Sequence, residues 1–180
     1  MYSHGIYSYT KINLMISSAN PNQFVYVDEL YECNKKYETR GKHMVICYIP
    51  TQNHIFGERP CSIRKFKGET YKYLFRNIRN QRKRSIGTEE FLISTPDCPI
   101  LKYDGSHVPI GDLKIGDDVM SIKTSSYNLD IEACISTLYY SFRYLEADVY
   151  TLSISPIRSN FGNNIFICAN GFLIGDSYVK

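Results

Sequence analysis

The centre of the chain carries Thr95-Pro96-Asp97-Cys98-Pro99-Ile100-Leu101, which is followed by the pairs Asp104-Gly105, Gly111-Asp112 and Gly116-Asp117. Apolar and polar residues alternate along this stretch, and a Gly, Pro or Asp stands at each expected turn. This pattern is typical of a β-hairpin. We therefore expect this part of the chain to form a hairpin at the edge of a small all-β domain.

The composition supports a single globular domain rich in strands. The 180 residues are 43% hydrophobic and 22% charged, which excludes a disordered chain. Tyrosine occurs 16 times and tryptophan not at all, and β-branched and aromatic residues favour the pleated surfaces of strands. The net charge of +3 is too small to indicate a nucleic-acid partner. Frequent Ile, Asn, Lys and Tyr suggest an AT-rich coding sequence, as in many large DNA viruses.

The six cysteines predict neither disulfides nor a metal site. No pair has C-x-x-C spacing, no histidine follows at finger spacing, and no other cofactor motif is present, so no cofactor is expected. The chain shows no charged-then-apolar leader and no run long enough to span a bilayer. We expect a reduced intracellular or virion-internal protein that does not contact membranes.

Short strands and turns account for most of the chain, and no long helix is expected. Residues 34–42, 50–60, 79–87 and 156–163 are polar or rich in turn residues and predict loops. Residues 71–95 predict one long hairpin, and Asn170-Gly171 predicts a two-residue type I′ turn. Residues 132–134 fit either a strand or a helical turn. The expected strands are residues 7–16, 24–31, 44–49, 61–66, 70–78, 90–95, 118–123, 129–144, 149–155, 164–168 and 172–174.

Two segments resemble motifs of one known family. The central stretch quoted above is similar to the inner motif of the Hedgehog/intein (Hint) family, which reads Thr-Pro-Asp-His-Pro, a hydrophobic pair, Asp-Gly and then Leu-Lys-x-Gly-Asp. Residues 149–154 and 164–177 resemble the family's last motif, a Val-Tyr-x-Leu-x-Val strand followed by Phe-x-Ala-Asn-Gly and a closing His-Asn before Ser or Cys. Both segments occur in the family's order.

The resemblance implies a fold and its boundaries. It predicts an all-β, intein-like horseshoe of antiparallel strands with long hairpins and little helix. Residues 1–7 would then be a short lead, residues 8–176 the Hint-like domain, and residues 177–180 a tail.

The resemblance also implies a set of site residues. In this family a first Cys or Ser attacks the preceding carbonyl, and a Thr and a His of the inner motif act on the departing amide nitrogen. A terminal Asn then cyclises with help from a penultimate His, and a Ser, Thr or Cys beyond it receives the chain. The positions that match these roles are Ser8, Thr95, Cys98, Asp176 and Ser177.

Both family histidines are missing at the matched positions. Cys98 stands in place of the inner histidine, and Gly175 stands in place of the penultimate one. A neutral thiol is a weak donor and is no acid near pH 7. Since general acid–base help supplies about 10²–10⁴-fold per group, the sequence predicts little or no catalysis.

One basic cluster offers a second candidate site, formed by Arg76, Arg79, Arg82, Lys83 and Arg84 near the tip of the long hairpin. It is either a contact for an acidic partner or phosphate, or a solvated loop that protects the hairpin edge. Because no aromatic residue alternates with these cations beyond Phe75, we favour the solvated loop.

Three functions follow as hypotheses. The first is a degenerate, splicing-inactive Hint-fold protein that serves as a structural or protein-binding module. In a large DNA virus this would be a minor capsid component within a larger assembly. The second is an active autoprocessing domain that uses Ser8, Thr95, Asp176 and Ser177. The third, binding of nucleic acid through the basic loop, is the least favoured.

Overall fold

The computed structural model describes residues 4–15, 24–36, 43–77, 90–124, 131–154 and 164–180. Within these ranges lie thirteen strands, one α-helix and two short 3-10 turns. The elements run β1 (Ile6–Tyr7), β2 (Lys11–Asn13), β3 (Phe24–Tyr26), α1 (Val27–Lys36), β4 (Val45–Ile49), β5 (His54–Glu58), β6 (Ser62–Asn77), β7 (Glu90–Ser94), β8 (Pro99–Leu101), β9 (His107–Pro109), β10 (Asp118–Thr124), β11 (Ile131–Ser153), β12 (Phe166–Ala169) and β13 (Phe172–Gly175).

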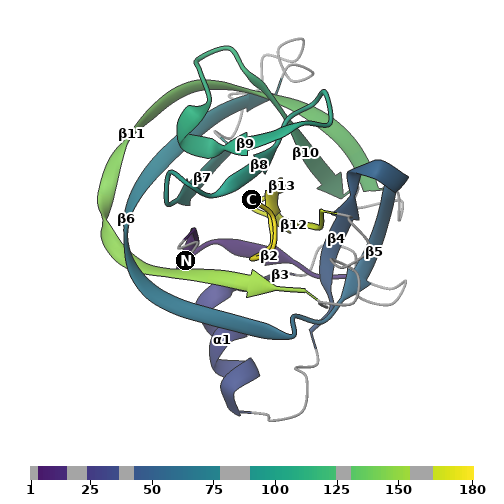
Figure 1. The fold of residues 1–180 in the computed structure, drawn as a ribbon, viewed down its shortest axis with the longest axis vertical. Helices are drawn as coiled ribbons and strands as arrows, with labels where there is room; N and C mark the ends of the chain where they lie inside the picture. The colour runs from purple at the N-terminus through teal and green to yellow at the C-terminus, as the bar shows by residue number, and fades with distance from the viewer. Residues whose placement is uncertain (1–3, 16–23, 37–42, 78–89, 125–130, 155–163) are drawn as a thin grey trace.

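Two very long strands form the outer frame. In Figure 1, β6 and β11 curve side by side around the molecule, and they pair antiparallel from Ser62 with Ser153 to Asn77 with Ser136. Two irregularities in the pairing bend β11, one at Leu138/Tyr140 and one at Arg143/Glu146. Because such bulges increase twist and bend a strand, they let this ladder close into a horseshoe.

The last strands fill the middle of the horseshoe. The β12–β13 hairpin lies at its centre in Figure 1, and it pairs with β2, β4, β8 and β10. Every residue of both strands is buried. Phe172 is fully buried against the Phe75 ring, with 4.5 Å between the ring centroids. The core therefore joins the outer frame to the end of the chain.

The expected hairpins are confirmed. β8 and β9 pair antiparallel through Ile100 and Val108, as the central stretch predicted. β6 and β7 form the long hairpin, with Tyr73 and Phe75 on its buried face. Asn170 and Gly171 both have positive φ angles, +50° and +84°, which the type I′ turn requires.

The segment after Tyr26 was predicted wrongly. A strand was expected to continue to Tyr31 and a loop to begin at residue 34, whereas residues 27–36 form α1. Val27 and Leu30 are buried one helical turn apart, and the Glu29 carboxylate accepts a hydrogen bond from the Tyr26 N–H at 3.3 Å, which caps the helix. The β-branched and aromatic residues before Val27 had masked this helical spacing.

Other boundaries also differ from the prediction, beginning with the expected strand 7–16, which is divided into β1 and β2. The expected strands 61–66 and 70–78 are one strand, β6, and the expected strands 129–144 and 149–155 are joined in β11. Residues 132–134 are strand and not a helical turn. The expected loop 50–60 contains β5, which pairs with β4. The loops expected at 79–87 and 156–163 lie outside the described residues.

Residues on both sides of the predicted domain 8–176 pack against it. Ile6 is buried and pairs with Tyr150 of β11, and Val179 is buried beside β13. The boundaries 8 and 176 remain a prediction. No helix in the described part of the chain is long and apolar enough to cross a membrane.

Candidate functional site

Thr95 binds the backbone near the start of the chain. It follows β7 directly, is buried, and accepts a hydrogen bond from the Gly5 N–H on its Oγ1 at 2.9 Å. The Thr95 N–H in turn donates to the Gly5 carbonyl at 2.9 Å. This exchange continues the pairing of Ile6 in β1 with Ser94 in β7. The amide nitrogen beside the Thr95 hydroxyl is thus that of the His4–Gly5 peptide bond.

His4 lies inside the molecule and reaches the other end of the chain. It is 3% exposed, and its carbonyl accepts a hydrogen bond from the Thr151 hydroxyl. Burial lowers the pKa of His4, while the charge of Asp97 and hydrogen bonds to the backbone of Asp176 and Gly175 raise it less. The His4 side chain borders a small cavity together with Cys98 and Gly175.

Backbone groups at the end of strand β11 hold Asp176 and Ser177 in position. The Asp176 carboxylate accepts hydrogen bonds from the Ile154 N–H at 3.2 Å and from the Tyr178 N–H at 3.0 Å. Burial nevertheless raises the pKa of Asp176 to about 6. The Ser177 N–H donates to the Leu152 carbonyl at 2.9 Å. The Asp176–Ser177 peptide bond is therefore fixed on both sides.

The two positions that lack a histidine are closed to solvent. Cys98 is buried, and burial raises the pKa of its thiol well above the ordinary range, so the thiol stays neutral. At Gly175, a Cβ atom would lie 2.7 Å from the Cβ of Val179. The structure thus has no space for a side chain at position 175 while Val179 stays where it is.

Of the expected site residues, four come together and one does not. Thr95, Cys98 and Asp176 lie around the His4–Gly5 segment, and Ser177 follows Asp176, bonded to Leu152 and Ser153. Ser8 points elsewhere, because its hydroxyl donates to the Asp148 carbonyl at 3.4 Å.

Sequence reasoning missed Gly5 and His4, the residues that Thr95, Cys98 and Asp176 surround. A search for a nucleophile passes over glycine, and no local pattern shows that Gly5 pairs with a residue ninety positions later. These two residues become visible only through the register of β1 against β7 and β11.

The basic cluster is described only at its first member. The Arg76 guanidinium lies over the Tyr139 ring, 4.1 Å from its centroid. Arg79, Arg82, Lys83 and Arg84 lie outside the described residues. Within the described ranges, no group of three His, Cys, Asp or Glu side chains is arranged to hold a metal ion.

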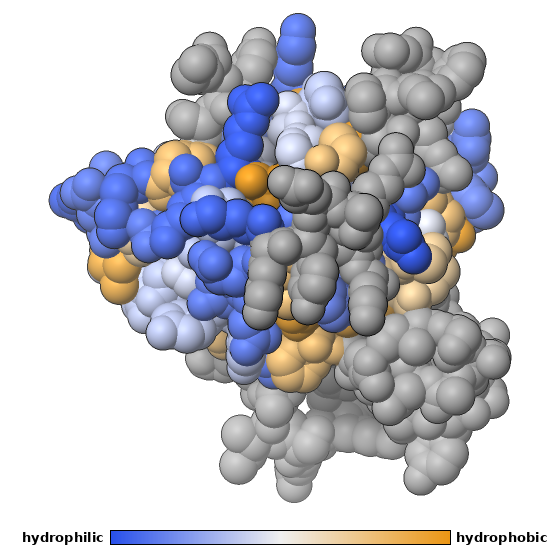
Figure 2. Space-filling model, turned by 90° about the horizontal axis from the view of Figure 1, so that it is seen from below, coloured by the Kyte–Doolittle hydropathy of each residue, from blue (hydrophilic) through white to orange (hydrophobic). Residues whose placement is uncertain are grey.

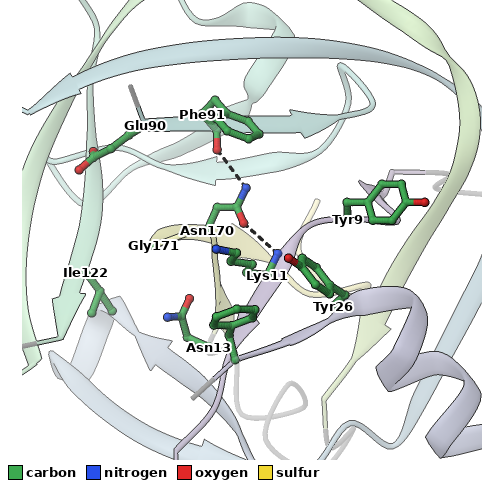
Figure 3. Close-up of a pocket in the computed structure, with 10 residues that line it drawn as sticks. Tyr9, Lys11, Asn13, Tyr26, Glu90, Phe91, Ile122, Asn170 and Gly171 are labelled. Carbon is green, nitrogen blue, oxygen red and sulfur yellow. Dashed lines mark hydrogen bonds between the residues drawn. The ribbon is translucent and has the colours of Figure 1, made fainter. Parts of the chain in front are cut away.

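A groove of about 710 Å³ opens on another part of the surface (Figure 3). Asn170 closes its floor, since its side-chain amide accepts a hydrogen bond from the Lys11 N–H at 2.8 Å and donates to the Phe91 carbonyl at 3.1 Å. Aromatic rings line the groove, from Tyr9, Phe24, Tyr26 and Phe91.

Solved structures of inteins share this fold. The Ssp DnaB mini-intein variant M86 superposes with a TM-score of 0.69 at 13% sequence identity, over 100% of this chain and 99% of that one. A DnaB intein from Synechocystis sp. PCC 6803 gives a TM-score of 0.67 at 14% identity, over 97% and 99% of the two chains. The TvoVMA intein gives 0.66 at 18% identity, over 97% and 98%.

No family model matches the sequence, and no curated protein matches it either. The likeness therefore lies in the architecture, over nearly the full length of both partners. This chain has the Hint fold of the inteins.

Proposed function

We propose that this chain is a Hint-fold protein-binding module that does not splice. The observation that carries the proposal is the hydrogen bond from the Gly5 N–H to Thr95 Oγ1. In the reaction that the resemblance implies, the inner threonine acts on the nitrogen of the peptide bond that is broken. The residue that contributes this nitrogen also carries the attacking side chain. Glycine has no side chain that could attack.

The space around Gly5 supports this proposal. A Cβ atom at Gly5 would lie 3.0 Å from the Tyr150 carbonyl oxygen and 3.2 Å from the Phe66 ring, which is tighter than ordinary contact. Ser8, the nucleophile expected from the sequence, is bonded to Asp148 instead. With Cys98 neutral and buried, position 98 supplies no acid for the departing nitrogen.

The binding half of the proposal rests on a stripe of aromatic rings, which we call the aromatic stripe. Neighbouring rings meet edge to face with centroids 5.5–6.3 Å apart. The stripe runs through Phe24, Tyr26, Tyr9, Tyr7 and Tyr144.

This stripe has the composition of an interface core. Tyr9 is 66% exposed, and Phe24 and Tyr144 are also exposed at the surface. Aromatic residues are enriched where proteins bind each other, because they bury a large area with few rotatable bonds. On the face seen in Figure 2, the hydrophobic residues that are not grey form small patches among hydrophilic ones. The stripe adjoins the groove of Figure 3, and we infer a protein partner that docks there.

Intact mass spectrometry tests the loss of splicing. The purified full chain is incubated near pH 7.5 with a thiol or with hydroxylamine, which intercept thioester and ester intermediates. We expect the N-terminus to stay uncut. Release of the first four residues would overturn the proposal, and release of the first seven would revive the Ser8 hypothesis.

The binding half is tested by cross-linking in the host extract. A partner that is captured by the natural chain should be lost when Tyr9→Ser and Phe24→Ser are combined, at an unchanged melting temperature. Tyr103→Ser is the matched control, since the exposure of Tyr103, 53%, lies between those of Tyr9 and Phe24 and the residue lies outside the stripe. A capture that is insensitive to the stripe variant would contradict this surface. A role in a viral particle stays a prediction from composition.

A further inference from the structure

We propose that the groove of Figure 3 binds an extended, proline-rich peptide segment that carries acidic side chains. The proposal rests on the protein-binding role proposed above and names the chemistry of the partner at that surface. The buried centre around Gly5 takes no part in it.

Two different parts of the fold form the walls of this groove. One wall is a face of the β2–β3 ribbon, which presents two cross-strand pairs, Lys11 with Tyr26 and Asn13 with Phe24. Since residues directly opposite each other share a face of a sheet, these side chains point to one side. The other wall is the edge of β7 at Phe91. A ligand in the groove therefore contacts the side chains of one wall and a strand edge of the other.

Backbone groups at the edges of both walls already have partners inside the chain. On β7, the Phe91 carbonyl accepts a hydrogen bond from the Asn170 side-chain amide at 3.1 Å. On β3, the Tyr26 N–H donates to the Glu29 carboxylate at 3.3 Å. Strand addition uses such edge groups for a row of main-chain hydrogen bonds. The groove is therefore built to bind a ligand through side chains and not as an added strand.

A proline-rich segment suits a groove of this kind. The polyproline II conformation makes no internal hydrogen bonds, and proline has no N–H that needs an acceptor. Aromatic grooves bind such segments well because the ligand is ordered before it binds. The Asn13 amide can donate to the carbonyls of the ligand, since its oxygen accepts a hydrogen bond from the Cys168 thiol at 3.4 Å.

The rings of the first wall form a ridged surface. Tyr26 stands between Phe24 and Tyr9, with centroid distances of 5.6 and 6.3 Å and angles between the ring planes of 71° and 84°. Rings that stand nearly at right angles leave hollows between them, whereas a flat stack would offer one smooth face. Because a polyproline II helix has three residues per turn, it presents a prolyl ring to the same side at every third residue. These rings can enter the hollows.

The charges at the groove favour an acidic ligand. The ammonium groups of Lys11 and Lys72 each lie 4.4 Å from the centroid of a ring that lines the groove, one on either wall. The Glu90 carboxylate points away from Lys11 in Figure 3 and accepts a hydrogen bond from the Ser136 hydroxyl at 2.9 Å. The two ammonium groups therefore attract carboxylates on the ligand.

Fluorescence anisotropy with labelled peptides tests the proposal on the natural full chain. The probe is a run of prolines with a glutamate at each end. We expect it to bind at least about tenfold more tightly than a flexible probe in which glycine and serine replace the prolines. Equal binding of the two probes, or no binding of the proline probe, would overturn the proposal. Tighter binding of an oligothymidine of the same length would also overturn it, because the groove would then select single-stranded nucleic acid.

Variants locate the probe in the groove. Lys11→Gln should weaken binding of the glutamate-flanked probe by about two- to fivefold, the effect of one exposed charge pair, and should not change binding of a glutamine-flanked probe. Lys35→Gln is the matched control, since Lys35 is an exposed lysine on α1 outside the groove. An equal effect of the two lysine variants would refute the site.

The aromatic wall has its own variant. Tyr26→Ser should weaken binding of both proline probes by about tenfold or more. A folded Tyr26→Ser chain that binds them as the natural chain does would contradict the proposal. If this variant does not fold, the comparison of Lys11→Gln with Lys35→Gln still decides the outcome.

Failure of this proposal differs from failure of the proposed function. A partner that is captured through the aromatic stripe and is not displaced by the proline probe would refute the proline-rich ligand and leave the binding role standing. Release of N-terminal residues in the mass spectra would refute the loss of splicing and leave the groove unaffected.

Discussion

Replacing Gly175 by alanine should destabilise the protein although it adds a single methyl group. The new Cβ would lie 2.7 Å from the Cβ of Val179 and 3.0 Å from that of Pro99, whereas carbon atoms rest at about 3.5–4.0 Å. Val179 is buried and cannot retreat easily, since its N–H is bonded to the Asp176 carbonyl at 3.1 Å. Overpacking of this kind costs about 1–3 kcal/mol in free energy of unfolding.

Urea unfolding of four chains measures this effect as a double-mutant cycle. The chains are the natural protein, Gly175→Ala, Val179→Gly and the double variant. Val179→Gly removes the opposing Cβ atom, so we expect Gly175→Ala to cost at least about 1 kcal/mol less in that background. An equal cost in both backgrounds, or none in the natural chain, would refute the argument that the C-terminal turn closes position 175.

Three further outcomes follow from the core and from the buried thiol and carboxyl groups. Phe172→Ala removes a ring packed against Phe75 and should lower the free energy of unfolding by about 3–5 kcal/mol in urea; a loss below about 2 kcal/mol would contradict the described core. Cys98 should resist iodoacetamide at pH 8 in the folded chain while the exposed Cys61 reacts, as peptide mapping would show; equal labelling would mean that the centre is open. The pKa of Asp176 is about 6 when folded and 3.8 ordinarily, so the folded chain holds this proton after the unfolded chain has lost it. The free energy of unfolding, measured relative to Asp176→Ala, should therefore fall by on the order of 2 kcal/mol as the pH rises from about 4 to about 6; a flat difference would contradict the buried position of this carboxyl group.

The strands were predictable where side chains alternate strictly. Tyr71, Tyr73 and Phe75 mark one face of β6, and the pair Asn170-Gly171 sets its own turn. The helix was not predictable by the same rule. Val27 continues an apolar and β-branched run that begins in β3, and only packing against the core shows that the chain changes from strand to helix there. Likewise, the polar residues around Arg143 conceal that β11 continues through a bulge.

Only those site residues that belong to a local sequence motif could be predicted. Thr95 and Asp176 follow from turns and strands close to them in sequence, and both lie where the motifs imply. Ser8 matches the first position because residues 8–15 resemble the Cys-Phe opening of the family and its first strand. The geometry instead places Gly5 beside Thr95, through a pairing between residues ninety positions apart. Long-range register of this kind leaves no trace in a single sequence.

The presence of Thr95 and Asp176 is therefore weak evidence for catalysis, because the fold needs both of them. Thr95 satisfies a buried backbone N–H at Gly5, and Asp176 satisfies those of Ile154 and Tyr178. An unpaired buried donor costs about 1–3 kcal/mol, so removing either side chain would destabilise a chain that never cleaves anything.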